Sequence, residues 1–190
     1  MAEEEPSAAA PDRAPTMTTQ WIQSAGGPLV FMHERVLRTW WGVYHPHNSV
    51  EEVASNAATD CDRACLVAGE IDSIKSRLGE SVLVLGDEPD LTTLWSVEGN
   101  HYLIRWRAAA SKQAMEEALN RSLRELAFEH GAPFQTAPGK HVLFDAACAG
   151  WTPDATLVCQ LEKTSYMVDS AFLRDASIAA LIHRLTPMPN

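Results

Sequence analysis

Two groups of closely spaced carboxylates are the side chains of this sequence whose types and spacing best suit chemistry. Asp60 and Asp62 form the first group, and Asp87, Glu88 and Asp90 form the second. Paired carboxylates can exchange protons or hold a magnesium ion, whereas a single one is more often a charged turn residue. As a set they favour another use, because a surface that binds a basic partner needs a high density of carboxylates.

The sequence offers little else that would support a reaction. It contains no Gly-x-Ser-x-Gly, Gly-x-Gly-x-x-Gly or Gly-Lys-Ser/Thr motif. His45 and His47 form the only close histidine pair, and His183, which lies in an apolar run, is expected to be structural. We therefore predict no catalytic residue, no cofactor and no metal site. The four cysteines lack the spacing of a zinc site and are predicted to be free thiols: Cys61, Cys65, Cys148 and Cys159.

Tryptophans are frequent, and one of them lies beside the second carboxylate group. Six occur in 190 residues, and most are expected in the core because each buries a large apolar area. Trp95 closely follows Asp90, so it is a candidate anchor of an interface there. The predicted partner-binding residues are therefore Asp60, Asp62, Asp87, Glu88, Asp90 and Trp95.

Predicted strands position the second carboxylate group. Val82–Leu85 and Tyr102–Trp106 contain residues that suit a half-buried pleated surface, and Leu94–Val97 lies between them. Gly86 and Pro89 end the first strand and force a turn. Unpaired carboxylates are costly to bury, so this turn is expected to face water or a partner. The segment around the first carboxylate group fits either a helical turn or the start of a strand.

The remaining periodicity predicts an α+β fold. Ser111–Phe128 has the apolar spacing of one long helix, and Val36–Trp41 predicts a short helix near the N-terminus. The final apolar run, Ile178–Leu185, also fits a helix but is interpreted as a strand that pairs with Ser165–Leu173. We therefore predict a single domain over residues 19–190, made mainly of antiparallel sheet with these two helices.

Charge and composition indicate the compartment and the kind of partner. The net charge of −10 disfavours direct binding of nucleic acid and favours a basic partner. Residues 1–18 are rich in Ala, Pro and Glu and are predicted to be a disordered tail, with Met17 as an alternative start of translation. The acidic beginning is unlike a signal peptide, and no apolar run reaches membrane-spanning length, which together predict a cytoplasmic protein.

Several short blocks resemble, in order, those of the immunity protein 21 family. Leu83–Pro89, with the sequence LVLGDEP, is the most telling of them. The resemblance covers roughly residues 20 to 188, and its specificity comes from the order and extent of the blocks. The chain departs from the family in its Ala/Pro-rich beginning and in the polar segment after Tyr44. The other blocks are Trp21–Leu29, Asp60–Cys65, Arg105–Trp106, Val142–Ala146 and His183–Leu185.

The resemblance implies an immunity protein of a bacterial polymorphic toxin system. Such a protein binds a cognate toxin, often a nuclease or another enzyme, and blocks it without catalysis. Against a nuclease, clustered carboxylates would compete for the basic cleft that binds phosphates. Two alternatives stay open from the residues alone. A module that binds a small ligand or a host protein predicts a deep apolar pocket, and a small enzyme dependent on carboxylates or thiols predicts a hydrophilic cleft with a histidine.

Overall fold

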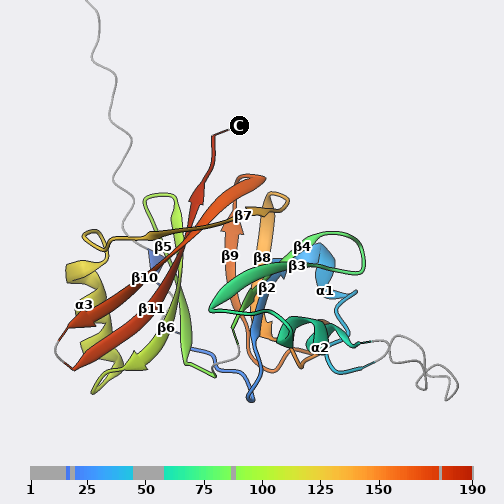
Figure 1. Cartoon of the computed structure of the whole chain (residues 1–190), viewed down its shortest axis with the longest axis horizontal. Helices are drawn as coiled ribbons and strands as arrows, with labels where there is room; N and C mark the ends of the chain where they lie inside the picture. The colour runs from blue at the N-terminus through green and yellow to red at the C-terminus, as the bar shows by residue number, and fades with distance from the viewer. Residues whose placement is uncertain (1–15, 18–19, 45–57, 87–88, 176, 190) are drawn as a thin grey trace, which may run out of the picture.

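A computed structural model of the chain describes residues 16–17, 20–44, 58–86, 89–175 and 177–189. These residues form two antiparallel sheets, with helices on both outer sides (Figure 1). The six-stranded sheet has the order β1-β5-β6-β11-β10-β7 and contains β1 Thr16–Met17, β5 Thr92–Val97, β6 Asn100–Ala108, β7 Glu129–Gln135, β10 Ser165–Asp175 and β11 Ile178–Pro187. The five-stranded sheet has the order β3-β4-β2-β8-β9 and contains β2 Leu29–His33, β3 Ile71–Lys75, β4 Ser81–Leu85, β8 Gly139–Asp145 and β9 Leu157–Leu161. The helices are α1 Glu34–Leu37, α2 Asp60–Cys65 and α3 Lys112–Ser122.

Three apolar clusters hold these layers together. One lies between the two sheets, a second lies under α1 and α2, and a third lies under α3. The strand β4 shows how the sequence divides between them. Leu83 and Leu85 belong to the cluster between the sheets, whereas Val82 and Val84 belong to the cluster under α1 and α2. Because successive side chains of a strand point to opposite faces, a strand that is apolar at every position is covered on both faces.

The predicted α+β class is wrong, because the described fold is mostly β. The long helix predicted over Ser111–Phe128 ends at Ser122, after 11 residues. Leu126 and Phe128, which lie beyond the helix, still pack against the apolar cluster under α3. Phe128, for example, lies under the guanidinium of Arg184 at 4.0 Å and then leads into β7, a strand that periodicity did not predict. Apolar spacing alone therefore overestimated the helix.

Two other expectations meet different outcomes. The short helix predicted over Val36–Trp41 is a single turn, α1, which covers Glu34–Leu37. The strand interpretation of the final run is confirmed, since β11 pairs antiparallel with β10. Within the described residues, the longest helix has 11 residues, and none is long and apolar enough to cross a membrane. Of the predicted tail, Thr16 and Met17 form β1, and the rest lies outside the described residues.

Two histidines lie inside the fold in neutral form. His183 is fully buried and its Nδ1 lies 2.8 Å from Ser170 Oγ, as expected of a structural imidazole. His141 is equally buried, and its Nε2 lies 2.7 Å from Thr136 Oγ1. Burial lowers the pKa of His183 to about 3 and that of His141 to about 4, well below the ordinary histidine value. Both side chains therefore resist protonation in the folded protein.

These histidines should make the stability of the fold depend on pH. Below about pH 6.5 the unfolded chain binds protons at both side chains and the folded chain does not. The free energy of unfolding should therefore fall on acidification, with each histidine adding a slope of about 1.4 kcal/mol per pH unit between about pH 4 and 6. Urea unfolding across this range measures the slope, which should be smaller in His183→Gln. An unchanged slope in that variant would contradict the assignment.

Candidate functional site

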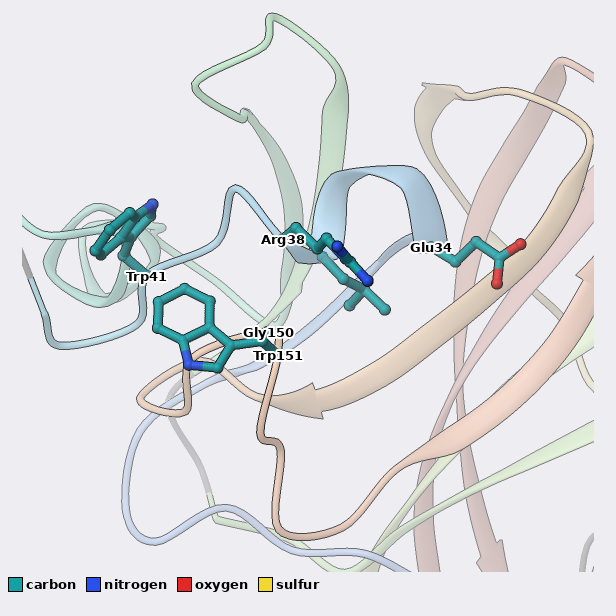
Figure 2. Close-up of a pocket in the computed structure, with 6 residues that line it drawn as sticks. Glu34, Arg38, Trp41, Gly150 and Trp151 are labelled. Carbon is teal, nitrogen blue, oxygen red and sulfur yellow. The ribbon is translucent and has the colours of Figure 1, made fainter. Parts of the chain in front are cut away.

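An open pocket of about 610 Å³ lies on the outer side of the five-stranded sheet. It forms where α1, the turn that follows it and the connection between β8 and β9 meet (Figure 2). We call it the tryptophan pocket because two indole rings form one of its sides. Its lining residues are Glu34, Leu37, Arg38, Trp41, Gly150 and Trp151.

The two tryptophans form an exposed aromatic pair. The ring centroids of Trp41 and Trp151 are 5.1 Å apart at an interplanar angle of 80°, which is a favourable edge-to-face arrangement. Trp151 is nevertheless 48% exposed, and the nearby Val43 and Tyr44 are more exposed still. Large apolar side chains gathered at the surface mark sites of interaction, and tryptophan and tyrosine are enriched at interfaces. The pocket therefore has the composition of a binding surface.

The first predicted carboxylate, Asp60, holds one side of this pocket in place. Its side chain is 1% exposed and accepts a hydrogen bond of 2.8 Å from the backbone N–H of Trp41. Two guanidinium groups compensate its charge, those of Arg63 at 3.3 Å and Arg77 at 3.2 Å. Asp60 thus ties α2 and the turn between β3 and β4 to the backbone of Trp41. Its observed role is in the framework of the pocket.

Gly150 secures the other side of the pocket. Its backbone N–H donates to the carbonyl of Trp40 at 2.9 Å, directly beside Trp151 in the sequence. A Cβ atom at Gly150 would overlap the carbonyl oxygen of Leu37. The close approach of these two backbone segments therefore requires glycine at this position. It also places Trp151 next to the end of α1.

Replacing Gly150 by alanine should destabilise the fold around the pocket. The added methyl group meets backbone rather than a flexible side chain, so we expect a loss of about 2–3 kcal/mol in the free energy of unfolding. Gly27→Ala is the matched control, because a Cβ there has nothing within 4 Å, and its effect should stay within about 0.5 kcal/mol. Denaturant unfolding of both variants measures the difference. Equal stabilities would show that the backbone approach is not needed.

Among the described residues, the cation at this pocket that has no carboxylate partner is Arg38. Glu34 pairs with Lys140 at 3.5 Å, and Arg35 on the same helix pairs with Glu80 at 2.6 Å. In the part of the chain that the structure describes, no carboxylate forms an ion pair with Arg38, whose side chain is exposed. The pocket therefore combines two aromatic rings with an available guanidinium.

The other predicted binding residues lie in varied places. Asp62 is exposed, and its carboxylate forms a capping box with Thr59 at the start of α2. Asp90 is largely buried and lies 3.1 Å from the guanidinium of Arg107. Trp95 is 1% exposed and packs in the core under α3, so it has no surface to offer a partner. Asp87 and Glu88 lie outside the described residues.

Sequence reasoning missed the residues that form this pocket. The spacing of Val36–Trp41 predicts a helix that contains Trp41, and Trp151 is not among the residues predicted to bind a partner. The sequence around Trp151 does contain a signal for an exposed position. Trp151 lies in a turn-forming segment, between Ala149-Gly150 and Thr152-Pro153-Asp154. A tryptophan within a polar turn has few ways to be fully buried.

The described residues offer no site for a metal ion, and two of the four thiols are held in protonated form. No group of three or more His, Cys, Asp or Glu side chains among them is arranged to hold a metal. All four cysteines are free, and burial raises the pKa of Cys61 and of Cys159 to about 12. Those two thiols therefore stay protonated at neutral pH, when only the thiolate would be nucleophilic.

Comparison with known proteins gives one match. The family model described as Immunity protein 21 matches residues 20–177, which is most of the chain. The searches of curated proteins and of solved structures found no match to this chain.

Proposed function

The chain belongs to the Immunity protein 21 family, and from this membership we propose that it binds a cognate bacterial toxin and occludes it without turnover. The family itself implies an immunity protein of a toxin system. The match over residues 20–177 is the observation that carries the proposal, because it covers every strand of the five-stranded sheet and four of the six strands of the other sheet rather than one short motif. We propose the cytoplasm of the producing cell as the place of this interaction.

We propose the tryptophan pocket as the part of the surface that contacts the toxin. Binding energy at interfaces concentrates in a few aromatic and arginine side chains, and this pocket contains Trp41, Trp151 and Arg38. Asp60 and Gly150 fix the backbone around it, so little conformational entropy would be lost on binding. Preorganised aromatic surfaces of this kind support tight complexes.

Negative charge supports a second contact, with a basic region of the toxin. The described residues contain 17 Asp and Glu against 14 Lys and Arg, so most of the net charge of −10 comes from residues 1–15, 45–57 and 87–88. Asp60 and Asp90 lie against arginines and are no longer proposed as contacts. We propose the exposed Asp62, together with Asp87 and Glu88, as the carboxylates that meet this basic region. A nuclease, whose active-site cleft binds phosphates, is the toxin class that this charge favours.

Growth rescue tests the proposed function. The chain is co-expressed with the toxin encoded by the adjacent reading frame, and we expect it to restore growth that the toxin alone abolishes. The purified proteins should then form a complex in which the activity of the toxin is blocked in proportion to the chain added. A toxin that stays active in the presence of excess folded chain would contradict the proposal. An unrelated toxin of similar charge serves as the control for specificity.

Charge reversal tests the contact with a basic region. The double variant Asp87→Lys/Glu88→Lys should slow association with the toxin by about tenfold at low salt, because it removes long-range attraction. The difference should shrink as added salt screens exposed charges. Stopped-flow mixing measures the association rate at each salt concentration. If the wild type and the double variant associate at the same rate at low salt, these two carboxylates do not contribute to the contact with the toxin.

A further inference from the structure

The charge of the tryptophan pocket indicates what kind of toxin segment it accepts. Figure 2 shows Arg38 between Glu34 and the two tryptophans, with the carboxylate of Glu34 directed away from the indole rings. Lys140 compensates that carboxylate at 3.5 Å. No described carboxylate compensates Arg38, so the pocket presents aromatic rings beside an available cation.

An occupant that matches both features carries an apolar ring next to a carboxylate. A planar guanidinium binds a carboxylate through two parallel hydrogen bonds, which fixes orientation as well as charge. The indole rings favour an apolar or aromatic group beside that carboxylate. A basic segment would place like charges together at Arg38. A nucleotide also combines a ring with an anion, but the net charge of −10 opposes phosphate groups.

We infer, resting on the proposed function, that the tryptophan pocket receives a segment of the toxin in which a large apolar side chain adjoins a carboxylate. This contact differs in chemistry from the basic region that Asp62, Asp87 and Glu88 are proposed to meet. The toxin is then held at two points of opposite charge, the tryptophan pocket and the carboxylates that meet its basic region. The contact of the carboxylates with the basic region is the one that weakens strongly with salt. A toxin that lacks the apolar and acidic segment loses the pocket contact although its basic cleft still attracts the chain, which makes the pocket the determinant of specificity.

Small probes test the chemistry of the pocket without the toxin. The full chain, labelled with ¹⁵N, is titrated with N-acetylphenylalanine and, separately, with its uncharged amide. The carboxylate probe should shift the indole N–H signals of Trp41 and Trp151 saturably at millimolar concentration, as its size allows, and bind about tenfold more tightly than the amide. Arg38→Gln should remove that preference. Arg35→Gln is the matched control, because Arg35 lies on the same helix and is paired with Glu80.

Several outcomes would overturn the inference. Equal binding of the two probes, no saturable shift with the carboxylate, or tighter binding of adenosine monophosphate would each do so. A structural role of Arg38 at the end of α1 would change stability in Arg38→Gln and leave the preference between the probes intact. If the toxin is neutralised equally well by Arg38→Glu, the inference fails and the proposed function stands. If the probes bind as expected but no toxin is neutralised, the proposed function fails and the chemistry of the pocket stands.

Discussion

Trp151→Ala is expected to weaken the complex with the cognate toxin by about thirtyfold, the equivalent of about 2 kcal/mol. The reason is that Trp151 is 48% exposed in the free protein and lines the tryptophan pocket beside Trp41. Folding should change far less, because the variant loses one edge-to-face contact with Trp41, worth about 1 kcal/mol. Isothermal titration calorimetry measures the affinity, and urea unfolding measures the stability.

Phe172→Ala is the matched control for this prediction. Phe172 is 50% exposed, almost the same as Trp151, but it lies on β10 of the other sheet. Its removal should leave the affinity for the toxin within about twofold of the wild-type value, as for a residue outside the interface. If the two variants lose affinity equally, or if Trp151→Ala loses none, the tryptophan pocket is not the docking surface.

Asp60→Ala is expected to lower the free energy of unfolding by about 3 kcal/mol. The substitution removes a carboxylate that is 1% exposed, leaves the backbone N–H of Trp41 without its acceptor, and deprives Arg63 and Arg77 of their shared partner. Since those two arginines are about one-third exposed, water partly compensates them and limits the loss. Denaturant unfolding measures the change.

Two further variants separate a framework role of Asp60 from a direct contact with the toxin. Asp60→Asn keeps an acceptor for Trp41 but loses the charge, so its stability should lie between those of the alanine variant and the wild type. Asp72→Ala removes an exposed carboxylate of β3 and should change stability by less than about 0.5 kcal/mol. If Asp60→Ala slows association with the toxin and leaves stability unchanged, Asp60 belongs to the interface instead.

The family and many of the strands could be predicted from the sequence, because both depend on patterns along the chain. β4 is an example, since Ser81–Leu85 is apolar at nearly every position and is bounded by turn residues. Its neighbours in the sheet could not be predicted in the same way. β4 lies between β3 and β2, and β2 is separated from it by about fifty residues of chain.

The candidate site depended on tertiary contacts that no local pattern records. Asp60 looked exposed because it is charged, yet Trp41 and Arg77, which are 19 and 17 positions away, surround it. Trp95 looked available beside the acidic turn, but the register of β5 places it opposite Tyr102 under α3. Burial is set by what packs against a residue, so local sequence gave the wrong environment for both.

Hydrogen exchange of the complex tests most directly whether the chain neutralises its toxin by binding through the tryptophan pocket. The chain is exchanged alone and with a saturating amount of the cognate toxin, and the protection of backbone amides is compared along the sequence. We predict that the toxin protects the amides of residues 37–44 and 149–152, which surround Trp41 and Trp151, in wild type and much less in Trp151→Ala. Protection confined to other segments, such as the hairpin of β10 and β11, would contradict binding through the tryptophan pocket. The same conclusion would follow if an active toxin left the protection of all amides unchanged.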